Sequence, residues 1–433
     1  MKIMCVAHGF PPELTGGTER TVEALALALQ GLGHDVVVVC GSLQVGSVDR
    51  VDEFEHRGLR VLRLHRDDLY FESWFKTYHP GVSRTVQRLL RDEQPDVVHV
   101  HHWLRLTSDL ARLARASGAR VVVTLHDYFP LLARVARRFD ESEIAVPPPA
   151  RWMSELEARE DFDLFRRDLF DELRAAHVLS APSRAHADGV TAVSLGELGE
   201  IVTSPSPLLD VPPRLECRPQ PGGHHLVTWG SIYPEKGLEV VLDAMRVAGG
   251  ELSLQVFGEA HDADYQTRIE ERAAGLNVTF RGPYRWADFG GISADYAVLP
   301  SLCQESYGLV VDEAQALGLP MVASDLPAYR EHCQPAASAF ATPGDVTAWA
   351  RVLADPDARA RLVRPSPPVL PSAVDAATDL LRSYSGVDHG SWRPDVDLER
   401  ARALQLFRRA ERRLYSALNG PELVLPPDEF LRD

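Results

Sequence analysis

Short apolar runs alternate along the chain with longer segments in which apolar residues recur every three or four positions. The first half contains four such runs, at residues 2–7, 34–41, 96–102 and 119–127. Between the first two, residues 18–33 place Val22, Leu25, Leu29 and Leu32 on one helical face. Strands that are buried on both faces and separated by helices form a parallel, doubly wound sheet, and this pattern predicts one.

The alternation stops at residues 205–224, where proline and glycine are frequent and no periodicity remains. We interpret this segment as a linker. The alternation then restarts, with apolar runs at residues 225–230, 251–258, 277–282, 294–301 and 320–325. Two tandem sheets of this type are expected to face each other across a cleft, because such sheets bind ligands beyond the carboxyl ends of their strands.

The chain is therefore predicted to be an α/β protein with two doubly wound, Rossmann-like domains. We expect an N-terminal domain at residues 1–210, a linker at 211–224 and a second domain at 225–370. Residues 371–433 are expected to form a return helix and a helical tail.

The tail carries a basic amphipathic pattern. Leu404, Phe407, Leu414 and Leu418 share one helical face, and five arginines lie on the others. Such a helix can lie on a membrane surface or dock on the body of the protein. Acidic residues nearby favour docking, and peripheral membrane contact is the alternative.

Charge and cysteine content narrow the function class. The formal charge of −16 argues against binding a nucleic-acid backbone, which requires a concentrated positive face. It leaves room for small anions, which a few amides and one lysine can hold. The five cysteines are scattered without a C-x-x-C pair, which is typical of buried thiols in a reducing compartment. With no signal-peptide pattern and no apolar run near the roughly 18 residues of a membrane span, we expect a cytoplasmic location.

Two loops that follow strands have the composition of phosphate sites. Gly16 and Gly17 directly precede a helix, where backbone N–H groups and the helix dipole favour an anion. Lys236, beside Gly237, follows the strand at 225–230. Each signal alone is weak, because a glycine pair is often a flexible turn and a loop lysine is often solvated.

A third loop, CQESYGLVVDEAQA at 303–316, places two glutamates eight positions apart. Glu305 precedes the predicted helix and Glu313 lies inside it, with the free amides of Gly308, Leu309 and Val310 between them. An anion on those amides would have a carboxylate on either side, each suited to accept from hydroxyl groups. A diphosphate flanked by a ribose and a hexose fits this description.

Motifs in these loops resemble those of one enzyme family. ESYGLVVDE is similar to the E-x7-E motif of retaining glycosyltransferases with the GT-B fold, and PPELTGGTER resembles their N-terminal glycine loop. DVVHVHH and TLHDYF resemble their acceptor-side strands, YPEKG their lysine loop and GLPMVASD their closing strand. The resemblance covers roughly residues 1–385, and the motifs occur in the family's order.

The resemblance implies a retaining transfer from a nucleotide diphosphate sugar, as donor substrate, to an acceptor hydroxyl, without a metal or other cofactor. Glu305, Lys236 and His126 would lie at the reaction centre. No protein nucleophile is agreed for the family, and the acceptor is proposed to attack the sugar on the same face that the phosphate leaves. The donor-binding residues it implies are Gly16, Gly17, Ser231, Lys236, Gly258, Tyr284, Glu305, Ser306, Tyr307, Gly308, Leu309, Val310 and Glu313. The acceptor-side residues it implies are Glu13, His102, Asp127 and Tyr128.

One residue departs from the family pattern. The family has arginine after the glycine of the lysine loop, and this chain has Ser231. A hydroxyl lacks the charged, bidentate contact to phosphate, which is worth about 1.5–3 kcal/mol. Either donor binding is weaker here or another cation, such as Arg281 or Arg285, replaces the arginine.

Other functions remain open at this stage. His99, His101 and His102 form a cluster without a carboxylate or cysteine that would complete a metal site, and the four D-x-D pairs are too frequent to discriminate. Glu305 and Glu313 could also be the acid and base of a hydrolase, but no second hydrolase motif accompanies them in the sequence. A non-catalytic nucleotide-sugar-binding protein, a sugar phosphorylase and an epimerase are alternatives. The acceptor can be an envelope polysaccharide, a glycolipid or a natural product.

Overall fold

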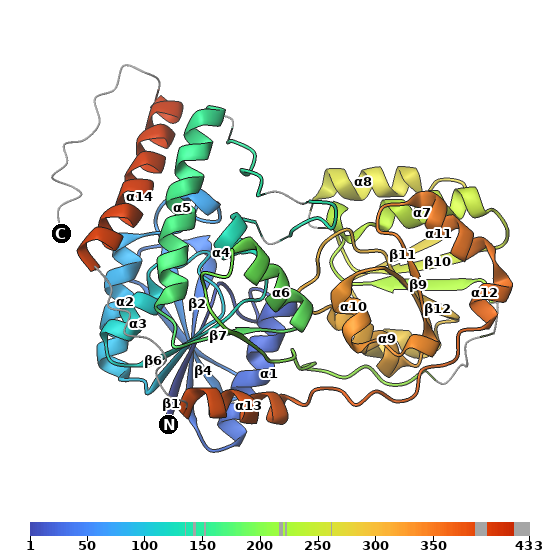
Figure 1. Ribbon diagram of the computed structural model, residues 1–433, viewed down its shortest axis with the longest axis horizontal. Helices are drawn as coiled ribbons and strands as arrows, with labels where there is room; N and C mark the ends of the chain where they lie inside the picture. Colours follow the sequence, from blue (N-terminus) through green and yellow to red (C-terminus); the bar gives the residue numbers. More distant parts are fainter. Residues whose placement is uncertain are drawn as a thin grey trace.

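The structure is a computed structural model that describes most of the chain. Its described residues are 1–134, 136–141, 144–150, 153–215, 220, 223–260, 262–385 and 396–419, with side chains from 401 to 415 in the last range. Parts of the predicted linker with Cys217, the side chain of Leu418 and residues 420–433 therefore lie outside the described part of the chain. Two α/β domains lie side by side, each built around its own sheet (Figure 1).

The first sheet has eight strands in the order β3-β4-β2-β1-β5-β6-β7-β8. Their bounds are β1 Lys2–Ala7, β2 Asp35–Val45, β3 Val51–His56, β4 Leu59–Arg66, β5 Val97–Val100, β6 Arg120–Thr124, β7 Val178–Ala181 and β8 Ile201–Thr203. All pairs are parallel except β3 with β4, a hairpin that the apolar runs do not reveal because β3 alternates exposed and half-buried residues. The four predicted runs of the first half form β1, β2, β5 and β6.

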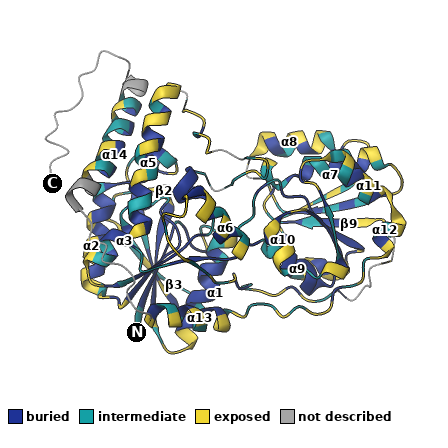
Figure 2. Cartoon of the chain, viewed as in Figure 1, coloured by how far each residue is buried: buried dark blue, intermediate teal, exposed yellow. Residues whose placement is uncertain are grey.

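Helices cover both faces of this sheet (Figure 2). Their bounds are α1 Gly17–Gly31, η1 Trp74–Lys76, α2 Pro80–Glu93, α3 Leu110–Ala116, α4 Phe129–Leu132, α5 Glu155–Arg174 and α6 Arg184–Val193. The predicted helical face of α1 is buried at Val22, Leu25 and Leu29, whereas Leu32 caps the helix and is exposed. The doubly wound arrangement follows from strands such as β5 and β6, which are buried on both faces.

The second sheet has six parallel strands in the order β11-β10-β9-β12-β13-β14. The strand bounds are β9 His225–Trp229, β10 Ser253–Phe257, β11 Asn277–Gly282, β12 Tyr296–Leu299, β13 Met321–Ser324 and β14 Ser338–Ala341. The helix bounds are η2 Pro234–Lys236, α7 Leu238–Ala248, α8 Ala263–Arg272, η3 Trp286–Gly291, α9 Leu309–Leu317, α10 Pro327–His332, η4 Pro335–Ala337, α11 Val346–Ala354 and α12 Pro356–Ala360. The predicted class, two Rossmann-like α/β domains, is confirmed.

After the second domain the chain runs back to the first (Figure 1). Helix α13, Ala373–Ser385, packs Ala377, Leu380 and Tyr384 into the same apolar cluster as Val22 and Leu29 of α1. The first domain is therefore completed by residues from the far end of the sequence.

The tail helix α14, Val396–Asn419, lies alongside α5 (Figure 1). Phe407 and Leu414 are buried on its inner face, and Arg402 forms an ion pair with Asp171 of α5 at 2.8 Å between Nη1 and Oδ2. The prediction of a docked helix is confirmed, because Arg402, Arg409 and Arg413 pair with carboxylates of α5. No helix in the described part of the chain has the length and apolar character needed to span a bilayer.

A strap from the first domain crosses to the second. Its residues 136–140 pair with the loop before α9, where the amide of Gln304 donates to the Arg137 carbonyl at 2.7 Å and the Phe139 amide donates to the Leu302 carbonyl at 3.0 Å. A second contact on the same loop comes from Ser183, whose Oγ donates to the Ser306 carbonyl at 2.6 Å. The loop that carries Glu305 is thus held by the first domain as well as by its own.

Candidate active site

A cavity of about 600 Å³ lies between the two domains. Every predicted donor-binding residue lines it, namely Gly16, Gly17, Ser231, Lys236, Gly258, Tyr284, Glu305, Ser306, Tyr307, Gly308, Leu309, Val310 and Glu313. His126 and Asp127 line it from the first domain. The loops after β1, β9 and β12 supply much of the wall, because parallel strands bring their carboxyl ends to one edge of a sheet.

Two helix starts from different domains face each other in this cavity. Helix α1 begins at Gly17 and α9 at Leu309, and a Cβ atom on Gly17 would lie 3.7 Å from Leu309 Cδ1. The first amides of each helix lack an intrahelical acceptor, and both dipoles direct positive potential to the same place. This geometry suits an anion such as a diphosphate.

Glycine is required at the start of α9. Gly308 has φ of +88°, and a side chain there would overlap the ring of Tyr329. The backbone can therefore approach a ligand closely at this position. Gly258 has a similar role at the end of β10, where φ is +130° and a Cβ atom would overlap the Gly230 carbonyl.

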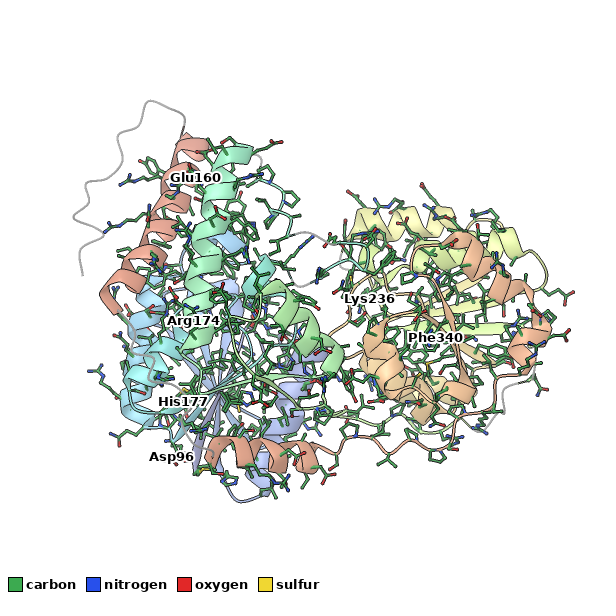
Figure 3. All side chains as sticks on the ribbon, viewed as in Figure 1. Asp96, Glu160, Arg174, His177, Lys236 and Phe340 are labelled. Atoms are coloured by element: carbon green, nitrogen blue, oxygen red, sulfur yellow. The ribbon has the colours of Figure 1, made fainter. Side chains whose placement is uncertain are left out.

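Lys236 and Glu305 form an ion pair in the cavity wall. Lys236 Nζ lies 2.7 Å from Glu305 Oε1, and Ser301 Oγ donates to the same oxygen at 2.6 Å. Burial raises the pKa of Glu305, but the Lys236 charge and hydrogen bonds from Lys236, Ser301 and Tyr329 outweigh it, so the pKa lies below its usual value. Glu305 is therefore an ionised acceptor, and Figure 3 shows Lys236 on the side of the second domain that faces the first.

Glu313 is held separately, by the indole of Trp229. Trp229 Nε1 donates to Glu313 Oε2 at 2.7 Å, and the Glu313 side chain is buried. Burial raises the pKa of Glu313, while the Trp229 hydrogen bond and the positive charge of Arg20 act in the opposite direction. One carboxylate oxygen is thus fixed to the protein, and the other is left to accept from a ligand hydroxyl.

An aromatic cluster closes the same end of the cavity. The rings of Phe257 and Phe289 stack with centroids 4.4 Å apart, and Tyr284 and Trp286 pack edge-on at 5.5 Å. Trp229, which holds Glu313, lies 6.3 Å from Trp286. A planar apolar group such as a nucleobase suits this end of the cavity.

His126 enters the cavity from the first domain. Its Nε2 is 2.9 Å from Nδ1 of His101, which lies just beyond β5. Burial lowers the pKa of His126 to about 4, with a smaller opposing effect from Asp127. His126 is consequently neutral near pH 7 and acts through hydrogen bonds, not through charge.

Three predicted acceptor-side residues do not line the cavity. Glu13 pairs with Arg63 at 3.1 Å between Oε2 and Nε. His102 is buried against Asp127, and Tyr128 is buried with its hydroxyl on Gln304 at 3.3 Å. These side chains lie behind the cavity wall, and their assignment to the acceptor side stays a prediction. Asp127 alone of the four lines the cavity.

The two arginines expected to replace the missing lysine-loop arginine also lie elsewhere. Arg281 projects from β11 onto Gln255 of β10, with its Nη2 donating at 2.9 Å. Arg285 is exposed, and neither residue lines the cavity. Neither named arginine takes that place in the structure, since strand alternation points Arg281 away from the cavity, and weaker donor binding stays a prediction.

Sequence reasoning missed Arg20, Trp229, Tyr329 and the strap. Arg20 lines the cavity from α1, and Tyr329 lines it from α10. Their contacts join segments that are distant in the sequence, so no local pattern marks them. Trp229 is the last residue of an apolar strand, and this position predicts a core residue.

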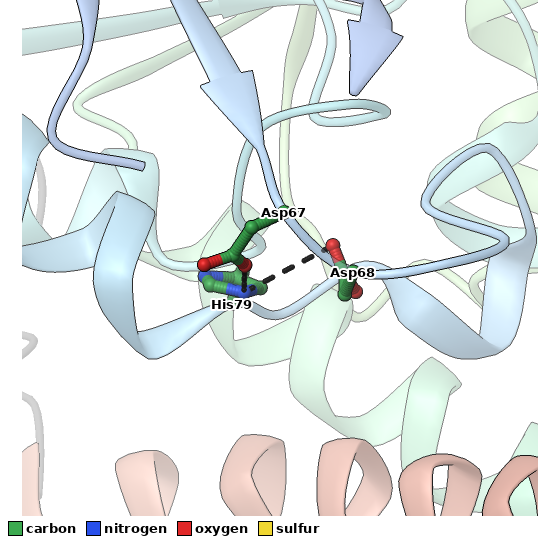
Figure 4. A group of neighbouring side chains, drawn as sticks. All are labelled: Asp67, Asp68 and His79. Atoms are coloured by element: carbon green, nitrogen blue, oxygen red, sulfur yellow. Dashed lines mark ion pairs between the residues drawn. The ribbon is translucent and has the colours of Figure 1, made fainter. Parts of the chain in front are cut away.

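A metal-like cluster of the first domain lies outside the cavity lining. Within the described residues, one group has metal-like geometry, Asp67, Asp68 and His79, shown in Figure 4. Arg66 and Lys76 already pair with Asp68 at 2.6 and 2.9 Å, so the group is an internal ion network that disfavours a further cation. His99 is fixed between Tyr384 and Thr124 by hydrogen bonds.

Two facing Rossmann-like domains with an anion cradle between them define the GT-B class of proteins. Residues 15–198 match the family described as Glycosyltransferase Family 4, and residues 223–355 match that described as Glycosyl transferases group 1. The chain belongs to the family 4-like GT-B glycosyltransferases.

Relatives of known name agree with this assignment. The glycogen synthase of Mycobacterium tuberculosis is 28% identical over 426 residues, which cover 92% of this chain and 98% of the relative. The D-inositol 3-phosphate glycosyltransferase of an Arthrobacter species is 30% identical over 333 residues, covering 71% of this chain and 74% of the relative.

Solved structures share the fold. Sucrose-phosphate synthase from Thermosynechococcus elongatus has a TM-score of 0.59 at 19% identity, and 96% of this chain and 100% of that chain are covered. Anabaena HepE in complex with UDP-glucose has a TM-score of 0.56 at 15% identity, with the same coverage of 96% and 100%.

Buried histidines predict acid sensitivity. Burial lowers the pKa of His99 to about 3 and of His126 and His186 to about 4. Since an unfolded histidine has a pKa of about 6.5, the unfolded state binds more protons than the folded state between these values, and stability falls as pH falls. We expect a loss of several kcal/mol between about pH 7 and pH 5, measured by urea unfolding. A flat profile over this range would contradict neutral burial.

Proposed function

We propose that the chain is a retaining, metal-independent glycosyltransferase that moves a sugar from a nucleoside diphosphate sugar to an acceptor hydroxyl. The observation that carries the proposal is the cradle between Glu305 and Glu313, in which two helix starts and Lys236 surround one cavity. The diphosphate would lie on the cradle, with the ribose at Glu313 and the transferred sugar at Glu305. This requires no metal or other cofactor.

Charge builds on the leaving diphosphate as the glycosidic bond breaks. Lys236 and the first amides of α9 are already oriented toward the cavity, so they stabilise that charge without reorganisation. Neutral His126 would donate or accept a hydrogen bond near the sugar. The residues of the chain thus bind and orient the donor and neutralise its diphosphate. The leaving phosphate accepts the proton of the acceptor hydroxyl.

Retention rests on the resemblance of residues 305–313 to the E-x7-E motif of retaining enzymes, and the engagement of the nearby carboxylates bears on the route of a retaining transfer. Glu305 Oε1 accepts from Lys236 and Ser301, and Asp127 accepts from the Phe129 amide at 2.8 Å. Within a retaining reaction, carboxylates held in this way disfavour a covalent glycosyl–enzyme intermediate, so the route we propose is attack by the acceptor on the face that the phosphate leaves.

The donor class is supported by the relatives. HepE is described in complex with UDP-glucose, and a matched relative is named a D-inositol 3-phosphate glycosyltransferase. We propose a hydroxyl of a carbohydrate, glycolipid or natural product as the acceptor, and the cytoplasm as the site of action.

A donor panel tests this function. UDP-, GDP- and TDP-sugars are titrated into the protein by calorimetry, and products formed with and without EDTA are analysed by NMR. We expect one donor class to bind and its product to keep the donor's anomeric configuration in EDTA. Inverted product, or dependence on a metal, contradicts the mechanism. No binding favours the accessory role that Ser231 suggested, and phosphorolysis or epimerisation without acceptor favours those activities.

A further inference from the structure

The cavity is poor in cations for a site that binds a diphosphate. In the described part of the chain, its lining contains five carboxylates, Asp127, Asp210, Glu259, Glu305 and Glu313. Its lysine and arginine residues are Lys236 and Arg20. The Lys236 charge is offset by Glu305 at 2.7 Å, and Ser231 offers a neutral hydroxyl. Arg20 is therefore the cation most available to an anion in this cavity.

Arg20 reaches the donor cradle from the first domain. It lies in the first turn of α1, the helix whose Gly17 faces Leu309 of α9 across the cavity. The Arg20 charge acts on Glu313 and Tyr284 of the second domain, lowering the pKa of each against the larger effect of burial. Arg20 therefore shares the cavity lining with Glu313 and Tyr284, and its charge acts on that end of the cavity.

The contact that holds Arg20 in this structure is weak. Nη2 donates to Asp210 Oδ2 at 3.3 Å, and the side chains of both residues are substantially exposed. Exposed single-nitrogen pairs contribute little to stability. A guanidinium has five N–H donors in a planar fork that matches phosphate oxygens, so a diphosphate can replace or share the Asp210 contact.

We propose that Arg20 is a donor-binding residue that pairs with the phosphates of the nucleoside diphosphate sugar, in the role that Ser231 cannot fill. The inference rests on the proposed function, since it assumes a donor in the cradle. A donor held mainly by the second domain is then also bound by the first. Donor binding therefore ties the two domains together, and the diphosphate is the part that Arg20 recognises.

The competing role is that Arg20 orients Glu313 and thereby the ribose. The two roles differ in what they recognise, because a phosphate contact disappears when the ligand has no phosphate. A contact made through Glu313 persists with the bare nucleoside.

Calorimetry with a phosphate series separates these roles. UDP, GDP, ADP and TDP are titrated into the wild-type chain, and the tightest binder sets a series of diphosphate, monophosphate and nucleoside. These are then titrated into Arg20→Gln and into the matched control Arg281→Gln, whose arginine lies outside the cavity. Circular dichroism and thermal unfolding check that each variant is folded.

We expect Arg20→Gln to weaken diphosphate binding by about 10–100-fold and to leave nucleoside binding unchanged. Arg20→Lys should retain part of the affinity, and Arg281→Gln should equal the wild type. Equal losses for diphosphate and nucleoside, or unchanged diphosphate binding, overturn the assignment of Arg20 and leave the proposed function standing. Absence of diphosphate binding in the wild type overturns the proposed function, and this inference with it.

Discussion

Replacing Lys236 with alanine is expected to lower kcat/KM for glycosyl transfer by about 1,000-fold or more. The variant loses the charge that stabilises the leaving diphosphate. It also leaves Glu305 without its cation at 2.7 Å, which raises the pKa of that carboxyl toward neutrality. The measurement is steady-state kinetics with the donor found in the panel.

The partner variant and a control complete this test. Glu305→Ala is expected to abolish transfer as well, and the double variant should lose little more than either single one, because the two residues act as a unit. Lys2→Ala removes a lysine paired with Glu93 on the first domain, far from the cavity lining, and should leave activity unchanged. Full activity in both Lys236→Ala and Glu305→Ala would contradict the assignment of these residues to the active site.

Removing both Arg409 and Arg413 is expected to destabilise the protein by about 3–5 kcal/mol. Asp161 of α5 is fully buried, and both arginines of α14 pair with it, Arg409 Nε at 2.7 Å. Burial raises the pKa of Asp161 against the effect of these two charges. Without them, an unpaired carboxylate stays buried, and urea unfolding measures the cost.

Two further variants sharpen the result. Asp161→Asn in the same background should restore part of the stability, because the buried charge is then absent. Arg382→Ala removes an exposed arginine paired with Asp379 on α13 and should change stability by no more than about 0.5 kcal/mol. Unchanged stability together with lost binding to anionic vesicles would identify α14 as a membrane helix instead of a docked one.

Much of the donor side could be predicted because its signals are local. Each of its features can be interpreted from about ten consecutive residues. They are a glycine pair before a helix, a lysine after a strand and two carboxylates around a helix start. Gly308, for example, is required by the backbone at the start of α9, and that requirement is visible in the sequence as a helix boundary. The same motifs do not reveal which side chains reach the cavity, because Glu13, His102 and Tyr128 lie on motif-bearing loops but pack behind its wall.

The sequence by itself determined the two α/β domains, the positions of most strands, the amphipathic tail helix and the loops that form the cradle. These properties follow from hydrophobic periodicity and from backbone chemistry, which act between neighbouring residues. Only the tertiary structure decided which groups meet across the cavity. Trp229 holds Glu313 over 84 positions, the strap reaches Gln304 from Arg137, and Arg20 faces the second domain. Such pairs depend on how the two domains pack, and no local pattern carries that information.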